Sequence, residues 1–580
     1  MLQQESVKVE INVPSKMRDG TILYADIYRP DTEDKYPAIL TRLPYGKSRQ
    51  IVGGYMDPQR MVRAGYVVVV QDIRGTGVSE GVFFARRAEP DDGYDTVEWV
   101  AKQPWCDGNV GMYGPSHLGF TQWAAAVTQP PHLRAICPAE TGAGARPFNI
   151  GAFRLNHMMM WYAGVSALSL ARSNLPPEEL KSQRERLSHM MANMEEQYLF
   201  LPLKDAPLTK IAKEPGIIPF YSEYLTQIEN EDYWKGLCSP APIDKVVIPA
   251  FHLCGWYDLL ASEVLESFQG MKKRGGSELA RKNQKLVMGP WTHGVGLLST
   301  AGELDFGMGS TGAAIDMAGM HIRWFDRFLK GIENGIMDEP PVRLFIMGDN
   351  VWRDENEWPL ARTRYKKYYF HSGGRANSRF GDGVLSREIP EREETDIYLY
   401  DPRNPTLTKT GNLSSIIMGA FDQQEVEERT DVLVYSSPPL ETDLEVTGPI
   451  EIKFWAASSA VDTDFTGKLV DVWPNGKAYN LVDGIVRARY RESESAAKLI
   501  KPEKVYEYSI NLGATSNVFK AGHRIRVEVS SSSFPKWDRN LNTGHPVGQD
   551  AEMKVAVQTI FHDRKYPSHI VLPVIPGKSR

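Results

Sequence analysis

The chain has 580 residues, of which 42% are hydrophobic and 24% charged, and its formal net charge is −6. This length exceeds what one hydrophobic core usually organises, so two or three domains are expected. The composition excludes a disordered protein, and the absence of clustered Lys and Arg argues against nucleic acid as a partner. A globular protein that acts on small molecules is the interpretation that remains.

The N-terminal segment and the cysteines bear on the cellular compartment. The first twenty residues lack the basic and then apolar plan of a signal peptide, and no apolar run is long enough to span a membrane. The cysteines lack the paired spacing of a zinc site and the density of a disulfide scaffold. The sequence therefore predicts a cytoplasmic protein without membrane contact or bound metal. Its four expected buried thiols are Cys106, Cys137, Cys238 and Cys254.

From residue 7 to about 127, strand-like runs alternate with helical stretches, which is typical of an α/β sheet. Residues 66–72 (YVVVVQD) are rich in β-branched side chains, as in a strand that helices cover on both faces. A predicted amphipathic helix over 91–103 and a short strand over 109–114 complete a βαβ unit.

Between residues 146 and 235 the strand-like runs disappear, and Met, Leu, Glu and Arg recur at helical spacing. Residues 176–198 predict one amphipathic helix that opens at Pro176. We interpret 146–235 as a helical insertion into the α/β domain. The expected inward side chains of the helix are Leu180, Leu187, Met190, Met191 and Met194.

The α/β pattern resumes with predicted strands over 245–253 and 285–289 and an amphipathic helix that ends at Gly331. After about Val351, short β-rich runs separated by turn residues predict a β-sandwich, and a jelly roll is expected. The predicted α/β domain thus comprises 1–145 and 236–350, the helical domain 146–235, and the β-sandwich 351–580.

The strongest local signal for chemistry is NVGMYGPSHLGF, in which a short strand leads through Gly114 and Ser116 into a helix. A serine between a strand and a helix sits on a sharp turn with its hydroxyl exposed. The general nucleophile-elbow pattern is GxSxG, whereas here Leu118 replaces the second glycine and Gly119 follows it. Simple N-capping of the helix is the alternative role for Ser116.

A serine nucleophile needs a histidine to take its proton and a carboxylate to orient that histidine. Asp258 and His293 each follow a predicted buried strand, in the chain order nucleophile, acid, histidine. Alone, Asp258 could cap a helix that begins at Leu259, and His293 could be an ordinary loop histidine. The order and placement of Ser116, Asp258 and His293 together favour a catalytic triad.

Further motifs in order are MRDGTILYADIYRP, TRLPYGK, QDIRGTGVSEG, DGYDTVEWVAKQPWCDGNVGMYGPSHLGF, GWYD, GPWTH and RWFDRFLKG. Across essentially the whole chain they resemble the cocaine esterase family of α/β-hydrolases (CocE/NonD hydrolases). The resemblance implies an α/β-hydrolase core, an inserted helical cap and a C-terminal jelly roll. It also places Ser116, Asp258 and His293 in the triad, with the Tyr45 hydroxyl and the backbone N–H of His117 as the oxyanion hole.

One residue departs from the family pattern. Tyrosine commonly follows the nucleophile, whereas this chain has His117. The backbone N–H is present with either side chain, so we expect the polar and titratable ring to affect substrate preference instead. We expect an acyl-enzyme on Ser116 that water releases, with small esters or amides as substrates and with neither a metal nor an organic cofactor. Candidates for an aromatic acyl pocket are Phe148, Phe153, His157, Trp161 and Phe534.

Other activities stay open at this stage. No acidic cluster for a substrate α-amino group is identifiable, which favours a neutral acyl group. The related X-Pro dipeptidyl-peptidase, α-amino-acid ester hydrolase and glutaryl-cephalosporin acylase activities remain alternatives. Intact triad residues argue against a protein of another class, an inactive core whose jelly roll binds carbohydrate. The sequence decides neither the physiological substrate nor the oligomeric state, and a homodimer is left open.

Overall fold

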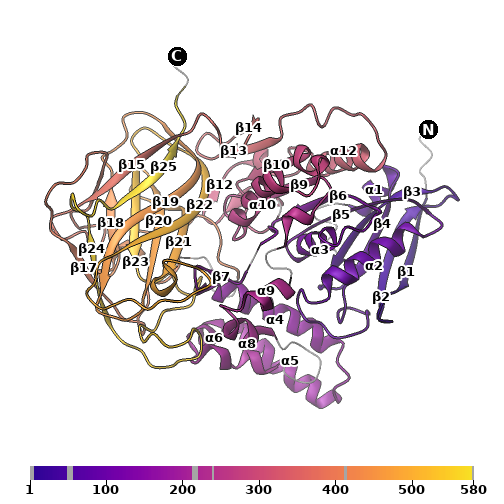
Figure 1. The fold of residues 1–580 in the computed structure, drawn as a ribbon, viewed down its shortest axis with the longest axis horizontal. Helices are drawn as coiled ribbons and strands as arrows, with labels where there is room; N and C mark the ends of the chain where they lie inside the picture. The colour runs from indigo at the N-terminus through magenta and orange to yellow at the C-terminus, as the bar shows by residue number, and fades with distance from the viewer. Residues whose placement is uncertain are drawn as a thin grey trace.

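The computed structural model describes residues 6–48, 57–144, 146–211, 220–237, 241–294, 296–409 and 415–577. An α/β part, a helical part and a β-rich part lie next to one another, with the helical part along one side of the other two (Figure 1). This is the α/β-hydrolase core with helical cap and β-sandwich that the sequence predicts. No helix in the described residues is both long and apolar enough to cross a membrane.

The core is a mostly parallel sheet of ten strands in the order β1-β2-β4-β3-β5-β6-β9-β10-β13-β14. The strands from β4 to β13 in this order run parallel, and antiparallel pairs close both edges. The predicted strand at 66–72 is β4, which is buried along its whole length. The strands are β1 (Val7–Lys16), β2 (Ile22–Pro30), β3 (Tyr36–Leu43), β4 (Val67–Asp72), β5 (Cys106–Pro115), β6 (Leu133–Ala139), β9 (Ala250–Gly255), β10 (Gln284–Gly289), β13 (Val342–Ile346) and β14 (Val351–Glu355).

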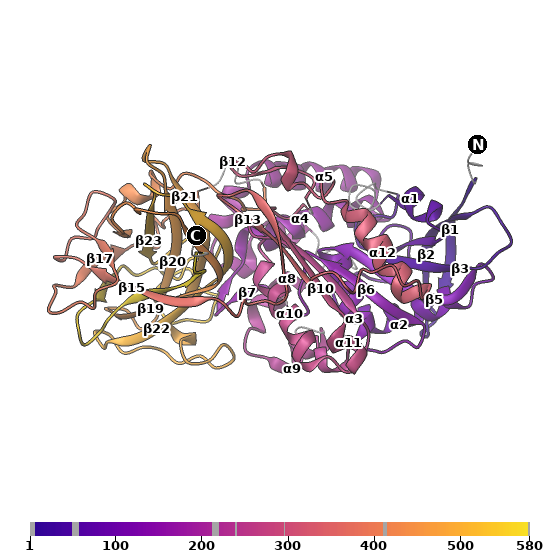
Figure 2. The same ribbon diagram turned by 90° about the horizontal axis from the view of Figure 1, so that it is seen from above.

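Helices cover both faces of this sheet and contribute apolar side chains to two separate cores. One face carries α2, α3, α10 and α11, and the other carries α1 and α12, as the view from above shows (Figure 2). A short ribbon of β11 and β12 follows β10. The bounds are α1 (Pro58–Arg63), α2 (Glu89–Ala101), α3 (His117–Ala126), α10 (Ala261–Arg274), α11 (Glu278–Lys282), α12 (Met317–Leu329), β11 (Thr300–Ala301) and β12 (Leu304–Asp305).

The helical cap has its own hydrophobic core. The single helix predicted over 176–198 is wrong, because Asn193 leaves helical geometry (φ −123°, ψ 48°) and splits it into α5 and α6. Of the side chains expected to point inward, Leu187 and Met194 are buried and the others are only partly buried. The cap elements are β7 (Phe148–Asn149), β8 (Ala152–Phe153), α4 (Leu155–Ala171), α5 (Pro177–Ala192), α6 (Met194–Leu199), α7 (Leu208–Ile211), α8 (Phe220–Thr226) and α9 (Glu231–Gly236).

The β-sandwich begins slightly later than the sequence suggests. β14 pairs with β13 in a hairpin of the core sheet, so the core extends beyond residue 350, and the first sandwich strand is β15. A short β-rich run looks the same in sequence whichever sheet it joins. The sandwich strands are β15 (Arg364–His371), β16 (Val384–Ser386), β17 (Asp396–Tyr400), β18 (Leu433–Ser436), β19 (Leu444–Ser458), β20 (Asp464–Val472), β21 (Ala478–Arg487), β22 (Tyr506–Phe519), β23 (Arg524–Ser530), β24 (Ala556–Phe561) and β25 (His569–Val574).

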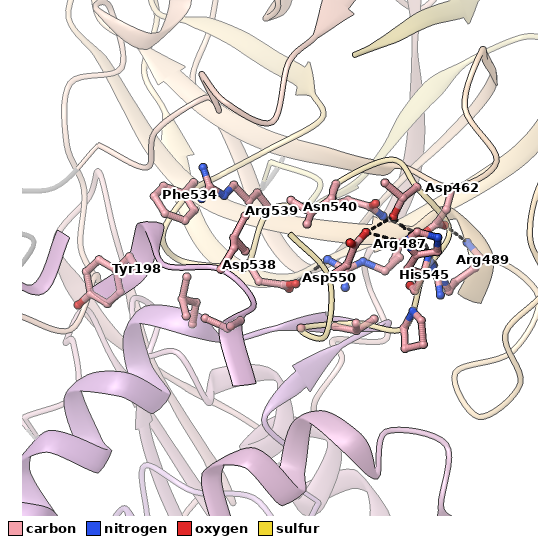
Figure 3. A pocket seen from close by; sticks show the side chains of 18 residues that line it. Tyr198, Asp462, Arg487, Arg489, Phe534, Asp538, Arg539, Asn540, His545 and Asp550 are labelled. Atoms are coloured by element: carbon pink, nitrogen blue, oxygen red, sulfur yellow. Dashed lines mark hydrogen bonds and ion pairs between the residues drawn. The ribbon is translucent and has the colours of Figure 1, made fainter. Parts of the chain in front are cut away.

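A buried ionic network ties the sandwich to the cap. Arg487 pairs with Asp464 and Asp538 at 2.9 and 3.0 Å and donates to the backbone carbonyl of Gly151. Arg487 and Asp538 are labelled in Figure 3. Asp538 in turn accepts a hydrogen bond from the Phe153 backbone N–H at 2.6 Å. Because Gly151 and Phe153 belong to the β7–β8 hairpin region, these contacts fix the start of the cap against the sandwich.

The thiols at positions 106, 137 and 254 are buried and form no disulfide. Cys238 lies outside the described residues.

Candidate active site

Four neighbouring strands of the core sheet end at one edge and bring polar side chains together there. The register aligns Pro115 of β5 with Ala139 of β6, and Gly255 of β9 with Gly289 of β10. The residues that follow these strands include Ser116, Glu140, Asp258 and His293. The carboxyl ends of these parallel strands thus bring four polar side chains to one edge of the sheet.

Ser116 occupies a strained turn between β5 and α3. Its φ of 57° and ψ of −124° are unusual for a non-glycine residue, and its backbone N–H donates to the Ala139 carbonyl at 2.8 Å. The Ser116 side chain makes no capping hydrogen bond to α3, which disfavours the N-cap role. The glycine that stands one position later than in the GxSxG pattern is Gly119. A side chain is excluded there, because a Cβ at Gly119 would lie 2.2 Å from Thr141 Cγ2.

His293 and Asp258 form a hydrogen-bonded pair, with His293 Nδ1 2.7 Å from Asp258 Oδ2. The Asp258 side chain is fully buried, and its other oxygen accepts from the Leu260 backbone N–H, so Asp258 orients the imidazole and also caps the following turn. Burial alone lowers the pKa of His293, but the carboxylates of Asp258 and Glu140 outweigh burial and raise that pKa to about 9.

Glu140 is a buried carboxylate of this crevice that the motif analysis missed. Its Oε1 accepts from the Gly294 backbone N–H at 2.7 Å, and its Oε2 lies 3.8 Å from His293 Nδ1. Glu140, Asp258 and His293 could together offer ligand atoms to a metal ion, but the hydrogen bonds already account for their arrangement. Its position directly after β6 could have predicted it, because Asp258 was predicted from its position after a buried strand.

Two hydrogen-bond donors lie next to Ser116, the Tyr45 hydroxyl and the His117 backbone N–H. The Tyr45 hydroxyl hydrogen-bonds with Ser116 and accepts from Trp161 Nε1 at 3.2 Å. Burial raises the pKa of Tyr45, which keeps its proton in place. His117 is the first residue of α3, where a backbone N–H has no partner within the helix.

The His117 ring lies in an aromatic box rather than in solvent. It stacks on Trp161 with centroids 5.9 Å apart, and Phe83 and Phe120 contact it at 6.3 and 5.7 Å. Burial, followed by the charges of nearby arginines, lowers the pKa of His117 to about 3. The expectation of a titratable ring beside the nucleophile is therefore wrong, because this imidazole is neutral throughout the physiological range.

The five candidates for an acyl pocket separate into two groups. His157 and Trp161 line a cavity of about 60 Å³ together with Ser116. Phe148 lines a larger cavity of about 630 Å³ that also contacts His157 and Asp258. Phe153 is buried in the cap core and Phe534 lies at the boundary of cap and sandwich (Figure 3), so neither is among the described residues that line the Ser116 cavity.

Comparison with known proteins agrees with this architecture. The profile of the X-Pro dipeptidyl-peptidase (S15 family) matches residues 19–295, and that of the X-Pro dipeptidyl-peptidase C-terminal non-catalytic domain matches residues 334–571. Cocaine esterase from Rhodococcus sp. (strain MB1 Bresler) is 39% identical over 98% of each chain. A putative serine esterase from Mycobacterium tuberculosis (strain CDC 1551 / Oshkosh) is 24% identical over 96% of this chain and 94% of its own.

Solved structures show the same fold over nearly the full length. An aminopeptidase from the marine sediment archaeon Thaumarchaeota archaeon has a TM-score of 0.79 at 25% identity and covers 99% of this chain and 97% of its own. Core, cap and sandwich together define an α/β-hydrolase with a C-terminal β domain. Within that class, the chain belongs to the cocaine esterase (CocE/NonD) family. This family of serine hydrolases is related to the S15 X-Pro dipeptidyl-peptidases.

Proposed function

We propose that this chain is a carboxylesterase that cleaves small esters through an acyl-enzyme on Ser116, with His293 as the base and Asp258 as its orienting carboxylate. The observation that carries the proposal is the 2.7 Å hydrogen bond between His293 and Asp258, together with a strained strand-to-helix turn at Ser116 on the same edge of the sheet. A hydroxyl nucleophile requires a histidine that a carboxylate orients, and this pair supports the proposal.

The mechanism has two acyl-transfer steps. Ser116 Oγ attacks the ester carbonyl while His293 Nε2 takes its proton, and the imidazolium returns that proton to the leaving alkoxide. Water, deprotonated by His293, then attacks the acyl-enzyme and releases the acid and free Ser116. Asp258 stays ionised and holds the imidazole through Nδ1. The Tyr45 hydroxyl and the His117 backbone N–H stabilise each tetrahedral oxyanion, by about 3 kcal/mol per donor.

Esters are favoured over peptides with a free amino terminus. A peptide substrate of that kind needs carboxylates near the scissile bond to bind its ammonium group. No Asp or Glu is among the described residues that line the Ser116 cavity. Carboxylates do line the adjoining larger cavity, where Glu231 and Glu263 pair with Arg146 and Arg154. The printed names of the relatives, cocaine esterase and putative serine esterase, support the same choice.

A fluorophosphonate probe tests the proposal directly. We expect one equivalent of probe per chain, covalently attached to Ser116, with loss of p-nitrophenyl acetate hydrolysis in proportion to labelling. Ser116→Ala should take up no probe and show no hydrolysis above the enzyme-free rate. Labelling at another residue, or undiminished turnover by the variant, contradicts the assignment of the nucleophile.

A further inference from the structure

One side chain of the cap contacts both residues proposed as oxyanion donors. Trp161 lies on α4, and its Nε1 donates to the Tyr45 hydroxyl oxygen at 3.2 Å. The Trp161 ring also stacks on the His117 ring, with centroids 5.9 Å apart and an interplanar angle of 20°. Trp161, His117 and Ser116 line the same cavity, so these contacts lie beside the proposed nucleophile.

The direction of the Trp161 hydrogen bond determines where the Tyr45 proton points. An indole N–H can only donate, so the Tyr45 oxygen accepts from Trp161 and directs its single proton elsewhere. Ser116 is the other hydrogen-bond partner of this hydroxyl, so the proton points to the place where an oxyanion would form. A hydroxyl that accepts one hydrogen bond is also a stronger donor in its own. In agreement, burial raises the pKa of Tyr45, and the hydrogen bonds with Trp161 and Ser116 act in the opposite direction.

The stacking contact acts on the second proposed donor. His117 is the first residue of α3, and its side chain is buried. Trp161, Phe83 and Phe120 enclose the His117 ring. An enclosed ring has few rotamers open to it, so the start of α3, which carries the His117 backbone N–H, is held against the cap.

The first turn of α4 is bound to the other two parts of the molecule. Arg154, directly before the helix, pairs with Glu263 of α10 in the core. Asn156 Oδ1 accepts from the backbone N–H of Ile417, in the C-terminal β-rich part, at 2.9 Å. Trp161 follows these contacts by less than two turns of helix, so its position depends on how the cap is seated on both neighbours.

We propose that Trp161 is a positioning residue for the oxyanion site, because its N–H holds the Tyr45 hydroxyl in the orientation that stabilises the tetrahedral intermediate. The inference rests on the proposed esterase function and on the oxyanion role of Tyr45, and it adds a residue of the cap to the machinery of the core. The indole touches no reacting atom in this role, so its N–H acts through Tyr45. The sequence singled out Trp161 only as a candidate for the wall of the acyl pocket, a role that predicts an effect on KM instead.

Trp161→Phe tests the inference, because it removes the N–H and keeps an aromatic ring for the His117 contact. With p-nitrophenyl acetate, kcat should fall about 3- to 10-fold with little change in KM. Both acyl-transfer steps pass through an oxyanion, so kcat responds whichever step limits it. The decisive measurement is the double-mutant cycle with Tyr45→Phe. In the Tyr45→Phe protein, Trp161→Phe should change kcat by less than about twofold, since the hydroxyl on which Trp161 acts is already gone.

Two further variants separate the N–H from the shape of the ring and from general effects on the cap. Replacement of Trp161 by benzothienylalanine, which has the shape of tryptophan but no N–H, should reproduce the loss of kcat. Trp234→Phe is the matched control, because Trp234 is a cap tryptophan whose Nε1 also donates, to the Gln227 carbonyl at 2.8 Å. Trp234 is not among the residues described as lining the Ser116 cavity, so this variant should keep the wild-type kcat.

Equal losses of kcat from Trp161→Phe in the wild-type and Tyr45→Phe proteins overturn the inference. So does a benzothienylalanine protein with the wild-type kcat, or a Tyr45→Phe protein with the wild-type kcat. A rise in KM at unchanged kcat overturns it as well and assigns Trp161 to the pocket wall. Failure of the esterase proposal is distinguishable from these outcomes, because the wild-type protein would then hydrolyse no ester and Ser116 would not take up the fluorophosphonate probe. Thermal unfolding shows whether each variant keeps its fold, and probe labelling gives the concentration of active sites to which kcat is referred.

Discussion

Arg487 and His293 are both cations held between two carboxylates, but only one of them can lose its proton. Arg487 lies 2.9 and 3.0 Å from Asp464 and Asp538, whereas His293 Nδ1 lies 2.7 and 3.8 Å from Asp258 and Glu140. A guanidinium stays charged at any pH at which the protein is folded, so the first cluster is a permanent salt-bridge network. An imidazole can take and return a proton, so the second cluster can do acid–base chemistry.

The comparison teaches that carboxylates around a buried cation do not by themselves mark an active site. The position of the cluster and the chemistry of the cation decide whether it can be an active site. The Arg487 cluster joins the sandwich to the cap, whereas the His293 cluster lies at the carboxyl edge of the parallel strands. Substitutions in the two clusters should therefore affect different properties, turnover in one and stability in the other.

Ser116→Ala should produce the largest change in turnover. We expect kcat to fall about 10⁶-fold, because the covalent route is lost and only binding and oxyanion stabilisation remain. The thermal midpoint should stay within a few degrees of the wild type, since the side chain makes no capping bond to α3. Steady-state kinetics and calorimetry measure the two effects. A loss of stability that parallels the loss of activity would contradict the expectation that substitutions at this edge of the sheet affect turnover and not stability.

Arg487→Met should act on stability instead. Removal of the guanidinium leaves Asp464 and Asp538 buried without their cation, which costs about 3–5 kcal/mol in the free energy of unfolding. Urea unfolding measures the change. Arg564→Met is the matched control, because Arg564 and its partner Glu391 are both exposed and such a pair contributes less than about 1 kcal/mol. Equal effects of the two substitutions would mean that burial is unimportant here.

Tyr45→Phe removes one proposed oxyanion donor and should lower kcat about 10²- to 10³-fold with little change in KM. The hydroxyl acts on the tetrahedral intermediate more than on the bound ester, which is why the effect falls on kcat. Tyr365→Phe, at an exposed tyrosine of the sandwich, should leave both constants unchanged. A rise in KM alone would instead assign the Tyr45 hydroxyl to substrate binding.

The sequence allowed the three-part fold and the chain order of Ser116, Asp258 and His293 to be predicted. Strand periodicity is a local signal, and so is the position of a polar residue directly after a buried parallel strand. Both can therefore be recognised in a single sequence. The neutral state of His117 could not be predicted, because it depends on burial of the ring, to which Trp161 of the cap contributes from outside the local motif. The break at Asn193 was equally invisible, since apolar spacing continues through it.

Glu140 shows the limit of motif reasoning at its clearest. It follows β6 with no glycine, proline or aromatic pattern to attract notice, and its role depends on how the neighbouring strand ends align. Two carboxylates around His293 raise the pKa of the imidazole above the ordinary 6.5. Because the proposed base, His293, must be neutral to accept a proton, kcat/KM should rise with pH and fall as pH drops through that raised pKa.

Glu140→Gln should move this pH midpoint downward by about one unit, because an opposite charge within 4–6 Å raises the pKa of a cation by one unit or more. The amide keeps an oxygen that can accept from the Gly294 N–H, so the loop should stay in place. Asp258→Asn should instead lower kcat about 10⁴-fold, since it disturbs the imidazole tautomer. A pH midpoint unmoved by Glu140→Gln would restrict Glu140 to holding Gly294. A 10⁴-fold loss would make it the orienting carboxylate in place of Asp258. Profiles of kcat/KM from pH 5 to 10 for the wild type and both variants separate these roles, because a purely structural carboxylate would change the amplitude and leave the midpoint where it was.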